Sequence, residues 1–193
     1  MIRMGIDSSK HKTGLAILKD EKIIYEKLVT FPKDMSVGEH LNLIRNNVKW
    51  FISRFKPEEV IVEDLNIVHM SAARHMFLYH GVIKEVVWFT TKQDATYVVN
   101  SEWRKPLGIK NPSKDEKIQK AYQIGTKRNG SPKLQEWDVK CVTIEYINKR
   151  LGTKYEYDDN DLADAVGLCL WGHDGGKVNA KDGRRKPKTK KKL

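Results

Sequence analysis

Four acidic residues combine the type and the position that metal or acid–base chemistry requires. Asp7 and Glu63 each end a short apolar run that predicts a buried strand, and strand ends are where folds usually place reactive groups. Asp161 and Asp164 are three residues apart, so in a helix they share one face. That face continues into apolar residues, which indicates that both carboxylates point toward the core.

Buried carboxylates are unfavourable unless positive charge compensates them. Lys and Arg are absent from residues 155–174, and only Arg3 lies near Asp7 in the sequence. A hard divalent cation would compensate several carboxylates at once, because it prefers oxygen ligands. The alternative for Asp161 is a first-turn acid that interacts with the helix dipole. That alternative is weaker for Asp164, which lies deeper in the apolar helix.

The elements that must hold these acids follow an α/β pattern. Short apolar runs predict strands at residues 2–7, 13–18, 22–30, 60–63 and 95–99, and the first three form an antiparallel meander because tight turns join them. Helical spacing and capping boxes predict helices that begin near residues 36, 71, 113, 135 and 160 and end near residues 57, 90, 124, 151 and 171. The composition of residues 125–134 predicts a loop.

Charge along the chain separates a folded part from a tail. The sequence has 193 residues and a formal net charge of +11. Residues 177–193 hold nine Lys or Arg and one acid, a net +8, so we expect a disordered tail after a single domain at residues 1–176. The tail is either an arm that binds phosphates or a solubilising terminus. The basic excess favours a polyanionic partner, either nucleic acid or an anionic membrane.

Cysteine usage and hydropathy indicate the compartment. Cys141 and Cys169 cannot form a disulfide framework, which favours a reducing environment. The start of the chain lacks the apolar core of a secretion signal, and no apolar run approaches the roughly 20 residues that span a bilayer. We therefore expect a cytoplasmic protein without a membrane partner.

Three ordered motifs make the sequence resemble RuvC-type Holliday-junction resolvases. They are Gly5-Ile6-Asp7-Ser8-Ser9 with Thr13-Gly14-Leu15-Ala16, then Val60-Ile61-Val62-Glu63, then Asp161-Leu162-Ala163-Asp164-Ala165. Residues 101–109 and the Lys-rich residues 113–120 also resemble these enzymes and related phage and viral nucleases. The resemblance covers residues 2–172 and implies the RNase H-like fold of the retroviral integrase superfamily. In that α/β fold a mixed five-stranded sheet of order 3-2-1-4-5 is flanked by helices, and the first and fourth strands are neighbours.

The resemblance also implies a function. Asp7, Glu63, Asp161 and Asp164 would bind two Mg²⁺ or Mn²⁺ ions per active site, for a phosphodiester hydrolysis that leaves a 5′ phosphate and a 3′ hydroxyl. The expected substrate is branched DNA, first of all the four-way junction. A homodimer is expected because the two-fold symmetry of the junction calls for two active sites. The expected setting is the nucleoid of a bacterial or phage-infected cell.

Basic residues are the candidates for contacts with DNA. By the resemblance, Lys117 best matches a basic residue that stabilises charge near the scissile phosphate, and Lys105 is the second candidate. Both are otherwise solvated surface lysines. The candidates for phosphate contacts are Lys12, Arg104, Lys105, Lys114, Lys127 and Arg128.

A residue that stacks on DNA bases is harder to assign. The segment after Glu63 lacks the aromatic residue that these resolvases often carry there, and Asn66, His69 and Met70 lie near that position. Trp103, beside two basic residues, is the tryptophan that we expect to reach DNA. The other four tryptophans lie on predicted helices and are expected in the core.

Three alternative functions follow from the same sequence. The same acids on the same fold would serve an RNase H that acts on RNA–DNA hybrids. A basic DNA-binding protein that keeps the fold without catalysis is the non-enzyme alternative. The segment GIDSSKHKTG at residues 5–14 also resembles the phosphate loop of actin-like sugar kinases and ATPases, but those enzymes need two such domains and nearly twice this length.

Overall fold

A mixed five-stranded sheet forms the centre of the molecule. The computed structural model describes residues 1–65, 70–126 and 132–176. The strand order is β3-β2-β1-β4-β5, which confirms the predicted fold class and order. The first three strands pair antiparallel, whereas β1, β4 and β5 pair parallel. The strands are β1 (Ile2–Ser8), β2 (Lys12–Lys19), β3 (Lys22–Thr30), β4 (Glu59–Glu63) and β5 (Thr96–Val98).

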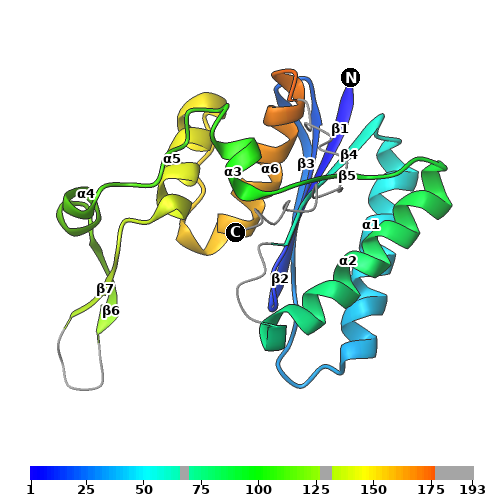
Figure 1. Cartoon of the computed structure of the whole chain (residues 1–193), viewed down its shortest axis with the longest axis horizontal. Helices are drawn as coiled ribbons and strands as arrows, with labels where there is room; N and C mark the ends of the chain where they lie inside the picture. Colours follow the sequence, from blue (N-terminus) through cyan, green and yellow to red (C-terminus); the bar gives the residue numbers. More distant parts are fainter. Residues whose placement is uncertain (66–69, 127–131, 177–193) are drawn as a thin grey trace, which may run out of the picture.

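Helices cover both faces of the sheet. Figure 1 shows α1 (Val37–Phe55) and α2 (Met70–Thr91) side by side on one face. On the other face lie α3 (Asn100–Arg104), α5 (Val139–Leu151) and α6 (Asn160–His173), the last preceded by the 3₁₀ turn η1 (Tyr157–Asp159). Each face therefore has its own apolar layer, with the sheet between them.

The predicted helix starts at Ser36 and Ser113 are confirmed. Both residues form capping boxes, in which the serine hydroxyl accepts from the backbone N–H of the glutamate three residues later. The second box opens α4 (Lys114–Gln119), which buries no residue.

The prediction is wrong for residues 120–126 and 132–134, whereas residues 127–131 lie outside the described residues. The helix ends at Gln119, and β6 (Tyr122–Thr126) pairs antiparallel with β7 (Pro132–Gln135) where a helix end and a loop were expected. Figure 1 shows α4 and this hairpin projecting beyond α5, away from the central sheet.

The exposure of three tryptophans also differs from the prediction, whereas Trp171 is buried as predicted. Trp103 is fully buried, whereas Trp50 and Trp88 have 48% and 51% of their surface exposed. Trp103 is therefore a core residue, because its ring packs in the layer between the sheet and α6.

Residues 177–193 lie outside the described residues, as do Asn66 and His69. The predicted tail and the two residues near the base-stacking position thus stay predictions. Within the described ranges, the structure has no helix that is both long and apolar enough to cross a membrane.

Two glycines let α6 lie directly on the sheet. A Cβ atom at Gly5 of β1 would lie 1.9 Å from the backbone oxygen of Ala165, and one at Gly14 of β2 would lie 2.0 Å from that of Asp161. Any side chain at these positions would push α6 away. The two glycines of the first hairpin therefore set the distance between the strands and the acidic start of α6.

Candidate functional site

Strand alternation turns Asp7 and Glu63 toward the same side of the sheet. Met4 and Ile6 of β1 and Val62 of β4 lie in the layer of α1 and α2. Successive side chains of a strand point to opposite faces, so Asp7 and Glu63 face α6. The parallel pairing of Ile6 with Val62 then places the two acids next to each other at the carboxyl ends of adjacent strands.

Helix α6 brings the other two acids to this place. Asp164 is 3% exposed, and its carboxylate forms a group with those of Asp7 and Glu63 in which one oxygen of each lies within 4.8 Å of the others. Asp161, which is 5% exposed, lies one turn earlier and acts electrostatically on Asp7. All four predicted acids are thus brought to one region, three of them within direct reach of a single ion.

The positive charges near the four carboxyl groups do not offset the effect of burial on their pKa. Burial raises the pKa of Asp7 well above its usual range, and the charges of Glu63, Asp164 and Asp161 raise it further. Burial, followed by the charge of Asp164, raises the pKa of Glu63 to about 7. Burial also raises the pKa of Asp161 and that of Asp164. A bound cation would reverse these shifts, because it favours the ionised carboxylates.

One arginine reaches the cluster from a distant part of the sequence. The Nη2 atom of Arg104 donates to Asp164 Oδ2 at 2.7 Å and lies 3.9 Å from Glu63 Oε2. Arg104 is only 7% exposed, and its guanidinium faces these acids. It therefore does not lie at the surface, where the predicted contact with a DNA phosphate would require it. Arg3, the basic residue nearest to Asp7 in sequence, pairs instead with Glu59 at 3.0 Å.

Two further contacts at the cluster were not foreseen from the sequence. The indole Nε1 of Trp103 donates to Glu63 Oε2 at 3.0 Å. Lys140, in the first turn of α5, donates from Nζ to Asn160 Oδ1 at 2.6 Å and lowers the pKa of Asp161 and of Asp164. Lys140 is thus a lysine beside the acids. No local pattern marks it, because the α5–α6 packing alone brings it there.

The residues present fit a divalent cation with hard oxygen ligands. The group of Asp7, Glu63 and Asp164 offers carboxylate oxygens only, which Mg²⁺, Mn²⁺ and Ca²⁺ prefer. Asp164 Oδ1 is buried and has no hydrogen-bond partner among the described residues. A buried, unpartnered carboxylate oxygen is costly on its own, and coordination to a cation would satisfy it.

Comparison with known proteins identifies the fold. No protein-family model and no curated protein sequence matches the chain. A structure of Thermus thermophilus RuvC in complex with a Holliday junction substrate aligns with a TM-score of 0.65 and 17% identity, over 89% of this chain and 92% of that one. A second Thermus thermophilus RuvC structure aligns with a TM-score of 0.66 and 17% identity, over 91% and 98%. This chain has the RuvC fold.

On the fold of this chain, the predicted basic residues other than Arg104 fall into four sets, of which the structure describes three. Lys12 lies near the acids, and its Nζ donates to the backbone oxygen of Asp158 at 2.9 Å. Lys105 is exposed directly after α3. Lys114 and Lys117 lie on α4, beyond α5 and away from the cluster (Figure 1). The remaining two, Lys127 and Arg128, lie outside the described residues.

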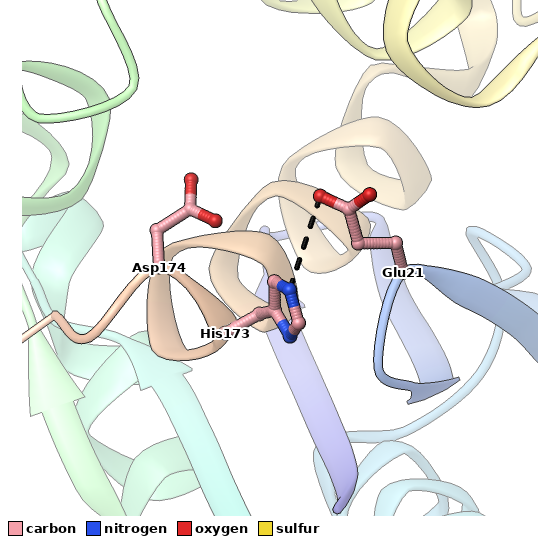
Figure 2. A group of neighbouring side chains, drawn as sticks. All are labelled: Glu21, His173 and Asp174. Atoms are coloured by element: carbon pink, nitrogen blue, oxygen red, sulfur yellow. Dashed lines mark ion pairs between the residues drawn. The ribbon is translucent and has the colours of Figure 1, made fainter.

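A second group of possible metal ligands lies at the other end of α6. Figure 2 shows Glu21, His173 and Asp174, with an ion pair of 3.9 Å between His173 Nε2 and Glu21 Oε1. Arg150 already bonds both acids: its Nη1 and Nη2 donate to Asp174 at 2.8 Å, and its Nε donates to Glu21 Oε1 at 3.1 Å. This surface group is a salt-bridge network that Arg150 completes.

Proposed function

We propose that the protein is a metal-dependent endonuclease that resolves Holliday junctions or other branched DNA. The observation that carries this proposal is the convergence of Asp7, Glu63 and Asp164, with Asp161 alongside, on the fold of RuvC. One of the similar RuvC structures contains a Holliday junction substrate. The basic excess of the sequence supports a nucleic-acid substrate as well.

The acids have distinct places in this mechanism. Asp7, Glu63 and Asp164 would hold Mg²⁺ or Mn²⁺, and Asp161, one helical turn before Asp164, would complete the ligand set for two ions. When bound, such ions supply Lewis acidity that activates a water and stabilises the leaving 3′ oxygen. The protein's own part is to hold four carboxylates in fixed positions, two at strand ends and two on α6.

A lysine near the scissile phosphate would stabilise the charge that develops on it. Lys140 lies beside the acids, whereas Lys117 lies on the projecting α4. We therefore assign the contact with the scissile phosphate to Lys140 and a contact with a more distant phosphate to Lys117. Lys140→Met should lower kcat by about 100–1,000-fold, whereas Lys117→Met should chiefly weaken DNA binding. A larger loss of kcat in Lys117→Met would reverse this assignment.

A homodimer would provide the two active sites that a two-fold symmetric junction requires. The outer face of α2 exposes Phe77, Gly81 and Trp88 at helical spacing. A Cβ atom at Gly81 would meet no other atom, so a second helix has room to approach there. We propose that this face of α2 packs against its copy in a second chain. Trp88→Glu should then yield monomers in sedimentation analysis, and an unchanged mass would rule out this face.

Cleavage of a panel of labelled DNAs tests the function. The panel contains a four-way junction, a flap, a linear duplex and an RNA–DNA hybrid, each incubated with Mg²⁺ or with EDTA. We expect paired incisions in the junction with Mg²⁺ and no product with EDTA. Preferred cleavage of the hybrid would indicate an RNase H instead. Tight junction binding with no cleavage of any substrate would indicate a non-catalytic DNA-binding protein.

A further inference from the structure

The short helix α3 supplies hydrogen-bond donors to two of the acids. Trp103 donates from Nε1 to Glu63 Oε2 at 3.0 Å, and Arg104 donates from Nη2 to Asp164 Oδ2 at 2.7 Å. These are consecutive residues of one helix, and each contacts a different member of the carboxylate group. One element of the fold thus fixes one oxygen of each of these two acids.

Both donors are held in place by packing. Trp103 is fully buried, and its ring lies against Gly167, which follows Asp164 by three residues on α6. A Cβ atom at Gly167 would lie 2.5 Å from the Trp103 ring, so only glycine leaves room for it there. The Arg104 guanidinium lies over the same ring, 4.8 Å from its centroid. The two donors therefore support each other and cannot easily follow a moving carboxylate.

The contacts with α3 use one carboxylate oxygen of Glu63 and one of Asp164, and leave the other oxygen of each acid without a bond to α3. Glu63 Oε2 is occupied by the indole, and Asp164 Oδ2 by the guanidinium. Asp164 Oδ1 is buried and has no hydrogen-bond partner among the described residues. Each acid can therefore offer one oxygen to a cation without disturbing a hydrogen bond, whereas bidentate binding would have to share an oxygen that already accepts one and that the donor holds in place.

We propose that Trp103 and Arg104 are positioning residues that make the site select Mg²⁺ over Ca²⁺. Mg²⁺ takes six ligands in near-ideal octahedral geometry, whereas Ca²⁺ takes six to eight and often binds carboxylates through both oxygens. Holding Glu63 and Asp164 to one oxygen each suits the smaller ion. This inference rests on the proposed function, because it requires a divalent cation at these acids.

The test measures the binding of Mg²⁺ alone and of Ca²⁺ alone to the full chain by titration calorimetry. Trp103→Phe keeps an aromatic side chain and removes the N–H donor. Arg104→Lys keeps the positive charge, so a changed ion preference reports on geometry. The matched controls are Trp50→Phe, a half-exposed tryptophan of α1, and Arg150→Lys, in the surface salt-bridge network. Asp7→Asn shows whether the measured binding occurs at the cluster.

We expect Mg²⁺ affinity to fall about 10–100-fold in Trp103→Phe and in Arg104→Lys, the range found when partners of metal ligands are removed. Ca²⁺ affinity should fall much less, and the controls should keep the wild-type ratio. An equal loss for both ions, or an unchanged ratio in Trp103→Phe, would overturn the positioning role while leaving the metal site intact. If binding is absent from the wild type or persists in Asp7→Asn, the metal site itself, and the proposed function with it, is wrong.

Discussion

Two carboxylate groups lie near opposite ends of α6, and each includes an arginine, but the groups differ in burial and in how many of their acids the arginine bonds. At the surface, Arg150 bonds both Glu21 and Asp174, and this bonding lowers the pKa of Asp174. In the buried group, Arg104 bonds Asp164 alone, while burial keeps the pKa of the carboxyl groups raised.

The difference shows why a count of acidic side chains does not identify a metal site. Both groups have three possible ligands within reach of one another. The surface group is solvated and has its own counterion, so an added cation would have to displace an arginine. In the buried group, Asp164 Oδ1 has no hydrogen-bond partner within the described part of the chain, and negative charge is in excess, so an added cation would remove an existing cost.

The largest expected effect separates the two groups by activity. Asp7→Asn removes a charged ligand from the buried group and should lower junction cleavage about 1,000-fold or more, which corresponds to about 4 kcal/mol of transition-state stabilisation. Glu21→Gln makes the same chemical change in the surface group and should leave the cleavage rate within about twofold. Single-turnover cleavage of a labelled junction measures both. Loss of activity in Glu21→Gln, or wild-type activity in Asp7→Asn, would reverse the assignment of the two groups.

A smaller effect is expected when Mg²⁺ is added to the protein without DNA. A ligand that binds only the folded state stabilises it by about 2.7 kcal/mol at a concentration 100 times its Kd. Thermal unfolding should therefore show a rise in Tm with Mg²⁺ in the wild type and in Glu21→Gln. No rise is expected in Asp7→Asn. An equal rise in all three proteins would place the bound ion outside the buried group.

The raised pKa of Glu63 predicts the pH dependence of the metal-free protein. Because this pKa is about 7 in the folded protein and 4.5 for an ordinary glutamate, the folded state binds more protons than the unfolded state between these values. The contribution of Glu63 is therefore most favourable below pH 4.5 and is lost as the pH rises through 7. In EDTA, the wild type should lose about 2 kcal/mol relative to Glu63→Gln between pH 5 and pH 8. Parallel unfolding curves for the two proteins would contradict the shift.

Much of the site follows from the sequence because its determinants are local. Asp7 and Glu63 end apolar strands, and the i, i+3 spacing of Asp161 and Asp164 needs only a helix. The alternation of strand side chains and the predicted strand order then bring these acids together. Gly5 and Gly14 belong to the same local motif, and the structure adds the reason, which is the close approach of α6.

The counterions could not be predicted in this way, because tertiary packing brings them to the acids. Arg104 is 60 residues from Asp164 and was expected to contact DNA, whereas it bonds that acid. Trp103 was assigned to DNA because two basic residues follow it, although its ring fills the space beside Gly167. Lys140 carries no local signal. A sequence pattern shows which residues share a strand or a helix face, but not which distant side chain completes a buried charge.

The smallest expected effect concerns the stability that the surface group provides. Glu21 and Asp174 are both more than a third exposed, and exposed ion pairs contribute about 1 kcal/mol or less. Glu21→Gln should therefore lower Tm by no more than about 4 °C in a protein of this size, and salt should reduce the difference because it screens exposed charges. Denaturation at low and high salt measures this. A loss of unfolding free energy well above about 1 kcal/mol that persists in high salt would mean that this network stabilises the fold as strongly as a buried pair. The contrast between the two ends of α6 would then rest only on Asp164 Oδ1, which has no partner among the described residues.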